Sequence, residues 1–336
     1  MTDFQIDRRV LLTICALGAT SLAVPAMATE SAAGISARLE RLVHGLAGRI
    51  GVAAQLIGGK EVMTVNGDEP FVMASTVKVA IAATVLDRVD KGELKLDQLI
   101  DITPEMIAAG DNVIAQNFVH PGIRLSVANL VEAMITESDN TATDACYGLA
   151  GGPAAVTEWL SRVGIMKQRA DRATAELMKD FYRLPAPGTP SVVAEVMRKD
   201  PTFASRLSDR NLEFENDPRD NSTPMAMLQL LLAIDNGKAL SPKSREFLLG
   251  SMSRTRTGKA RLKGLLPKGV PVAHKTGTLG GVANDVGYVT LPDGQRFAIA
   301  VFTSSSTTSE ADRDRAIAEI ARTLYDYFLT QQRANP

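Results

Sequence analysis

The chain has 336 residues, of which 45% are hydrophobic and 22% are charged, and its formal net charge is −1. This composition is typical of a globular protein with enough apolar material for one large core or two lobes. A nearly neutral chain without long runs of Lys or Arg gives no reason to expect nucleic acid or an acidic membrane surface as a partner. The three histidines have no metal-ligand spacing, so we expect neither a metal nor an organic cofactor.

The first 28 residues have the pattern of an export signal. Arg8 and Arg9 precede an apolar stretch from Val10 to Val24, and the small residues Ala26 and Ala28 suit a cleavage site. The paired arginines are compatible with the twin-arginine route. The stretch is short for a membrane span. We therefore expect a signal peptide at 1–28 and a mature chain that is periplasmic or secreted, without stable membrane insertion.

Helical patterns follow in chain order and fill the middle of the sequence. A first helix is expected at about 35–48, and helical periodicity then extends from Thr76 to about Leu177. Residues 178–220 are less regular, with one short helical pattern at 190–199. Further helices are expected at 223–237, 241–254 and about 309–331.

Strand patterns lie near both ends of the chain. Two short strands surround Gly58-Gly59, and three more lie between Pro271 and Ser305. The simplest packing joins them into one antiparallel sheet with the terminal helices on its face, beside an all-helical lobe, which is an α+β fold. We expect one catalytic domain at 29–336, with a site in the cleft between the lobes. The expected boundaries are 29–72 and 245–336 for the sheet lobe and 73–244 for the helical lobe.

The run "FVMASTVKVAIAATVL" places Ser75 and Lys78 three residues apart at the start of an apolar helix, on one helix face. A neutral lysine in that place accepts the serine proton and creates a nucleophile. Alone the pattern is weak, because Ser-x-x-Lys arises by chance about once in a chain of this length. A helix-capping serine and a lysine that reaches the surface give the same letters.

Two further motifs strengthen the case, Ser138-Asp139-Asn140 between two helices and Lys275-Thr276-Gly277 on a C-terminal strand. In this order and spacing the three motifs resemble the active-site serine penicillin-recognising proteins, and class A β-lactamases in particular. The resemblance covers about residues 35–330, except the irregular segment 178–219.

The resemblance implies roles for the first two motifs. Ser75 is the nucleophile that becomes acylated, and Lys78 is its proton partner. Ser138 passes the proton to the lactam nitrogen as that atom leaves. Asn140 holds Lys78 and the side-chain amide of the substrate.

The resemblance also implies a substrate-binding strand. Lys275 supplies positive potential near the substrate carboxylate, Thr276 hydrogen-bonds that carboxylate, and Gly277 completes the motif. The backbone N–H groups of Ser75 and Thr278 form the oxyanion hole. Arg261 matches a position where some family members place a carboxylate-binding arginine, although a plain surface arginine fits the sequence equally well.

The sequence departs from the family in the loop that supplies the deacylating glutamate, Asp-Arg-x-Glu-Pro-x-Leu-Asn. In "DRATAELM", Thr174 stands where the glutamate is expected and Met178 where the asparagine is expected. A second partial match, "DRNLEFEN", places Glu213 one position late and Asn216 three beyond it. We take Glu213 with Asn216 as the first candidate for the water-activating base.

An insertion accounts for the two partial matches. Arg172 and Asp220 correspond to the pair that closes this loop by a salt bridge, but they stand 48 positions apart. We therefore expect an enlarged loop over about 171–222. Glu215 is the second candidate for its base, and Glu176 is less favoured because it matches a variable, outward position.

The leading prediction is a secreted serine β-lactamase that forms an acyl-enzyme at Ser75 and acts as a monomer on a small β-lactam. The main alternative is a D-alanyl-D-alanine peptidase of cell-wall metabolism, which Thr174 in place of the glutamate favours. The other alternative is a penicillin-binding protein without turnover. The complete set of two serines and two lysines argues against it, because binding alone needs no activated nucleophile.

Overall fold

The computed structural model describes residues 31–110, 113–118 and 120–334. The predicted signal peptide, 1–28, lies outside these residues. In the described part of the chain, each helix is too short or too polar to cross a bilayer.

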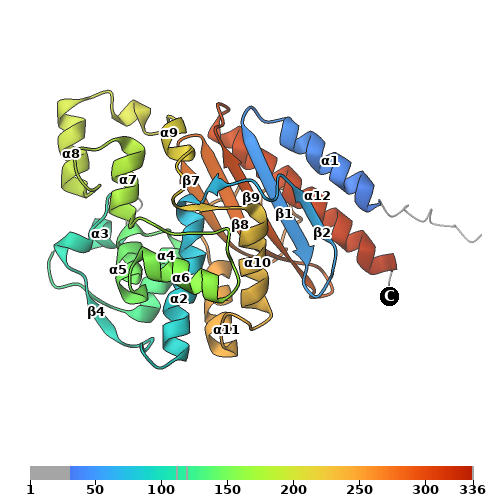
Figure 1. Cartoon of the computed structure of the whole chain (residues 1–336), viewed down its shortest axis with the longest axis horizontal. Helices are drawn as coiled ribbons and strands as arrows, with labels where there is room; N and C mark the ends of the chain where they lie inside the picture. Colours follow the sequence, from blue (N-terminus) through green and yellow to red (C-terminus); the bar gives the residue numbers. More distant parts are fainter. Residues whose placement is uncertain (1–30, 111–112, 119, 335–336) are drawn as a thin grey trace, which may run out of the picture.

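The central feature is a five-stranded antiparallel sheet in the order β2-β1-β9-β8-β7 (Figure 1). Its N-terminal and C-terminal strands are joined directly, because β1 pairs with β9 over its whole length and places Val52 opposite Val301. The predicted α+β fold is therefore confirmed. The strands span Arg49–Leu56 (β1), Val62–Val65 (β2), Val272–Leu279 (β7), Val282–Thr290 (β8) and Arg296–Ser304 (β9).

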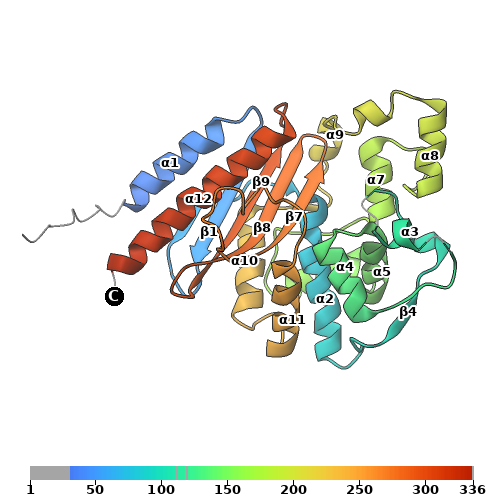
Figure 2. The same ribbon diagram turned by 180° about the vertical axis from the view of Figure 1, so that it is seen from behind.

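Two terminal helices, α1 (Ala32–His44) and α12 (Glu310–Ala334), lie side by side on one face of the sheet (Figure 2). Ile35, Leu39 and Phe328 are among the buried residues that join them to the strands. The other face is covered by α10 (Pro224–Asp235), which packs on β1 and β9. The sequence pattern placed α10 in the helical lobe; its residues are apolar nearly all round, so periodicity does not reveal which surface it covers.

The remaining helices surround α2 (Lys78–Asp90) and form the helical lobe. Each residue of α2 from Lys78 to Leu86 is buried, which fixes the helix rigidly between its neighbours. The neighbours include α4 (Val127–Thr136), α5 (Asn140–Ala150), α6 (Pro153–Arg162) and α11 (Pro242–Ser253). Smaller elements complete the lobe: η1 (Ala74–Val77), η2 (Pro104–Met106), α3 (Val113–Asn117), β4 (Leu99–Asp101) and β5 (Arg124–Ser126).

The segment expected to be irregular is largely helical, and it projects beside the helical lobe (Figure 1). The predicted helix at 190–199 is confirmed as α8 (Pro190–Lys199). The helical pattern was expected to end at about Leu177, but α7 (Thr174–Tyr182) extends beyond it, and η3 (Ala204–Arg206) and α9 (Leu212–Glu215) were not predicted. A small core of Val72, Phe181 and Phe214 packs these turns together. The short strands β3 (Phe71–Val72) and β6 (Asn221–Ser222) pair where the segment returns.

Asn284 on β8 ties the sheet to the chain just before Ser75. Its side-chain amide donates to the carbonyl oxygens of Val72 and Met73 at 2.8 and 3.0 Å, and its oxygen accepts from the Thr303 N–H at 3.0 Å. Asn284 is fully buried, so water cannot replace these bonds. They help hold Ala74 at φ 47°, a left-handed conformation that non-glycine residues seldom adopt.

Replacing Asn284 by alanine should lower the free energy of unfolding by about 3 kcal/mol, because buried backbone groups lose their partners. Denaturant unfolding measures this change. Met166→Ala is the control, since Met166 is 74% exposed and should shift stability by about 0.5 kcal/mol at most. Equal effects of the two variants would contradict a structural role for Asn284.

Candidate active site

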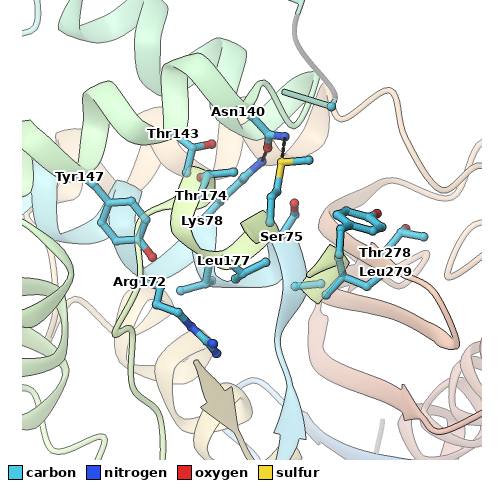
Figure 3. Close-up of a pocket in the computed structure, with 15 residues that line it drawn as sticks. Ser75, Lys78, Asn140, Thr143, Tyr147, Arg172, Thr174, Leu177, Thr278 and Leu279 are labelled. Atoms are coloured by element: carbon cyan, nitrogen blue, oxygen red, sulfur yellow. Dashed lines mark hydrogen bonds between the residues drawn. The ribbon is translucent and has the colours of Figure 1, made fainter. Parts of the chain in front are cut away.

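Ser75 lies in the turn η1 that leads into α2, and its side chain reaches a cleft between the lobes (Figure 3). Strand β7 closes on this turn at Gly277. A Cβ atom there would lie 2.5 Å from the Met73 carbonyl oxygen and 3.1 Å from the Ser75 nitrogen, so only glycine allows this approach. The start of the helix and the edge of the sheet thus meet at the predicted nucleophile.

Lys78 is held on the floor of the cleft by the loop between α4 and α5. Its ammonium donates to the Ser138 carbonyl oxygen at 2.6 Å and to Ser138 Oγ at 3.1 Å. It also donates to Asn140 Oδ1 at 3.0 Å (Figure 3). Asn140 in turn donates to the Ala109 carbonyl oxygen at 2.8 Å. Lys78 is 2% exposed, so these bonds hold its ammonium in one place.

The Ser138 hydroxyl lies between two ammonium groups. Lys275 Nζ, from β7, donates to Ser138 Oγ at 3.0 Å and to the Thr276 carbonyl oxygen at 2.8 Å. Ser138 itself has φ 60°, which is strained for a serine. Two cations near one hydroxyl favour negative charge on its oxygen, so this group is suited to passing a proton.

The other half of the cleft includes Thr276, Thr278 and a loop over 256–261. The Thr276 hydroxyl shares a 2.6 Å hydrogen bond with that of Thr257. Thr278 is exposed to the cleft, at its boundary with the Ser75 side. The structure therefore brings together Ser75, Lys78, Ser138, Asn140, Lys275, Thr276, Gly277 and Thr278, as the sequence predicted.

Arg261 lies beside this half of the cleft, but its nitrogen atoms all bond to the protein. Nε pairs with Asp314 at 2.6 Å, Nη1 donates to the carbonyl oxygens of Gly277 and Asn284, and Nη2 donates to Thr278 Oγ1 at 2.9 Å. Arg261 is 3% exposed. It holds strand β7 in place, and this arrangement gives no support to its predicted contact with a substrate.

The enlarged loop is closed by the predicted ion pair. Arg172 Nε donates to Asp220 Oδ2 at 2.6 Å, and both side chains are buried. Burial raises the pKa of Asp220, while hydrogen bonds from the Asp171 and Arg172 backbones and from the Arg172 guanidinium oppose that rise. The 47 residues between them therefore leave and return to the body of the protein at this ion pair.

The predicted deacylating glutamates do not lie in the cleft. Glu213 has a side chain that is 84% exposed and pairs with Arg183 at 3.3 Å in a separate cavity. Asn216, the expected partner of Glu213, lines another cavity together with Glu215, and Glu215 bonds to Ser304 and Ser305. Glu176 faces solvent beside Lys179. The small core around Phe214 turns α9 away from Ser75, which sequence matching could not show.

Thr174 occupies the cleft instead, together with Leu177 and Met178. Its backbone N–H donates to Asp144 Oδ1 at 2.7 Å, and the Ala175 N–H donates to Asp144 Oδ2 at 3.3 Å. The carboxylate of Asp144 on α5 thus caps the N-terminus of α7. Sequence reasoning missed Asp144, although it stands one helical turn after Asn140 and so on the same face.

A model of the β-lactamase enzyme family matches residues 34–328. β-Lactamase VEB-1 of Pseudomonas aeruginosa is 32% identical to the chain, over 97% of this chain and all of that protein. The extended-spectrum β-lactamase PER-1 of the same organism is 29% identical over 87% and 86% of the two chains. An ancestral class A β-lactamase superposes with a TM-score of 0.72 at 32% identity, covering 87% of this chain and 99% of that one.

A two-lobed α+β fold with a serine in its cleft and two buried lysines around Ser138 is the arrangement of a serine hydrolase of the acyl-enzyme type. The chain belongs to the β-lactamase enzyme family, and its relatives and structural neighbours identify it as a class A enzyme that hydrolyses β-lactams. These similarities do not favour the alternatives of a peptidase or a non-turnover binding protein.

If Arg261 holds β7, Arg261→Ala should lower the free energy of unfolding by about 3–5 kcal/mol, because it leaves Asp314 without its buried partner. The melting temperature should fall clearly, while KM for a penicillin should change little at a temperature where the variant is folded. An unchanged melting temperature with a tenfold higher KM would instead assign Arg261 to substrate binding.

Proposed function

We propose that this enzyme opens the β-lactam ring by forming an acyl-enzyme at Ser75. The observation that carries the proposal is the Ser138 hydroxyl, which lies 3.1 Å from the Lys78 ammonium nitrogen and 3.0 Å from that of Lys275. A binding protein has no need of two buried lysines around one hydroxyl. Two buried lysines beside one hydroxyl suit a group through which a proton is transferred.

Acylation follows from this arrangement in three proton transfers. Lys78, in its neutral form, accepts the proton of Ser75 as the serine oxygen attacks the lactam carbonyl carbon. The backbone N–H groups of Ser75 and Thr278 stabilise the oxyanion of the tetrahedral intermediate. When the C–N bond breaks, the Ser138 hydroxyl gives its proton to the nitrogen and recovers one from Lys78.

Substrate binding uses the same strand and loop. Lys275 supplies positive charge to the substrate carboxylate, and Thr276 and Thr278 supply hydroxyl groups next to Gly277. Asn140 presents its amide to the side chain of the substrate. Gly277 adds no side chain and thereby lets strand β7 lie close to the turn that carries Ser75.

The proposal extends to the setting of the enzyme. Arg8 and Arg9 before an apolar stretch support export to the periplasm or the medium, where β-lactams are met. A net charge of −1 supports a small-molecule substrate rather than nucleic acid as the partner. We propose that the exported enzyme acts as a monomer and confers resistance to β-lactam antibiotics.

Intact-protein mass spectrometry after brief exposure to benzylpenicillin tests the acyl-enzyme. The wild-type chain should gain the mass of one intact penicillin, which peptide mapping places on Ser75, and Ser75→Ala should gain none. A Ser75→Ala variant that still acquires the adduct or turns over penicillin would refute the assignment of the nucleophile. Release of D-alanine from a D-alanyl-D-alanine peptide, faster than penicillin hydrolysis, would favour the peptidase.

A further inference from the structure

We propose that Thr174 and Asp144 form a proton relay that activates the water which hydrolyses the acyl-enzyme. This inference rests on the proposed acylation of Ser75 and assigns the second half of the same reaction. The Thr174 hydroxyl would contact the water, and Asp144, behind it, would receive the proton. Asp144 is therefore a positioning residue and proton acceptor rather than a group that touches the substrate.

The need for such a relay comes from the walls of the cleft. One half of the cleft is lined by Ser75 and by residues of the enlarged loop. None of the described residues that line this half is an aspartate or a glutamate. Hydrolysis of an ester by water is slow without a base, and a positioned base typically contributes about 10²–10⁴-fold. A carboxylate base on this side must therefore act through one of the lining groups.

Thr174 is the lining group that is placed for this role. It lines the cleft together with Ser75 and Lys78, at the start of α7 (Figure 3). Its backbone N–H donates to the Asp144 carboxylate at 2.7 Å, which places the Thr174 side chain beside that carboxylate, and hydrogen bonding from this side chain lowers the pKa of Asp144. A hydroxyl that donates to a carboxylate keeps its oxygen lone pairs for a second donor, which a water molecule in the cleft can supply.

Asp144 is placed to accept a proton. Burial raises the pKa of its carboxyl above the usual range, although hydrogen bonds from the side chain and backbone of Thr174 and from the Ala175 N–H oppose that rise. The charged and titratable groups that face it are Lys78 on α2, which favours the carboxylate, and Tyr147 on its own helix. A carboxylate with a raised pKa is a stronger base than an exposed one.

The proposed step balances in protons and electron pairs. The water oxygen forms a bond to the acyl carbonyl carbon, its proton passes to Thr174 Oγ, and the Thr174 hydroxyl proton passes to Asp144. The tetrahedral intermediate then breaks its bond to Ser75 Oγ and releases the product acid. The proton returns from Asp144 through Thr174 to Ser75 Oγ, so each group ends in its starting state.

The other candidates near the cleft are less suitable. Glu213 is mostly exposed, and Glu215 is bonded to Ser304 and Ser305. The Tyr147 hydroxyl shares the cleft, but burial raises its pKa well above the usual value, so it stays protonated. Tyr147→Phe therefore serves as a control for Thr174→Val, because it removes a second hydroxyl near the same carboxylate.

The test follows the loss of the penicilloyl adduct by intact-protein mass spectrometry after the free penicillin has been removed. Thr174→Val and Asp144→Asn should form the adduct at a rate within about threefold of the wild type and lose it about 100-fold more slowly. Thr174→Ser keeps a hydroxyl and should stay within tenfold of the wild type. Tyr147→Phe should lose the adduct at the wild-type rate.

A pH profile separates the relay from a structural role of Asp144 in capping α7. The wild-type rate of adduct loss should fall as the pH drops through the pKa of Asp144, because a protonated carboxyl cannot accept another proton. Asp144→Asn should lack this dependence. Thr174→Val keeps the backbone N–H that Asp144 caps, so it tests the relay even if Asp144→Asn folds poorly.

Adduct loss at the wild-type rate in Thr174→Val would overturn the relay, as would equal slowing by Thr174→Ser and Thr174→Val. If Tyr147→Phe slowed adduct loss and Thr174→Val did not, the assignment of the relay hydroxyl to Thr174 would be overturned. Failure of the wild-type chain to form any adduct on Ser75 would instead refute the proposed acylation, so the two failures are distinguishable.

Discussion

The hydroxyl of Ser138, held between the ammonium groups of Lys78 and Lys275, is the contact on which the cleft depends. It joins three parts of the chain, since Lys78 comes from the buried helix α2, Ser138 from the α4–α5 loop and Lys275 from strand β7. Two cations close together inside a protein are costly unless hydrogen bonds stabilise both. The burial of α2 and the anchoring of β7 by Arg261 prevent these groups from moving apart.

Much of this arrangement was predictable from the sequence because it depends on short motifs with fixed local geometry. Ser75 and Lys78 share a helix face at a spacing of three, and the alternating pattern of the C-terminal strands placed Lys275 on a sheet. The ion pair of Arg172 with Asp220 was also predicted, since both ends of the loop keep their residue types. Such features can be predicted without knowing how the side chains pack.

The interior of the enlarged loop was not predictable in the same way. Glu213 was chosen because it stands near the expected position in a motif, but the packing of Phe181 against Phe214 decides where α9 points. The role of Asp144 was missed because its partners, Thr174 and Ala175, are 30 and 31 positions away. In the proposed mechanism, acylation depends on rigid elements whose positions the sequence predicts well, and deacylation depends on a loop whose fold the sequence predicts poorly.

The central claim is that an enzyme in which no described aspartate or glutamate lines the Ser75 side of the cleft still completes both halves of the reaction through Ser75. A stopped-flow progress curve with a large excess of a chromogenic cephalosporin tests this claim most directly. The account predicts a rapid phase of about one equivalent of ring opening, followed by sustained turnover over many equivalents. A curve that stops after one equivalent would contradict it, because the acyl-enzyme would then form without any group to activate water.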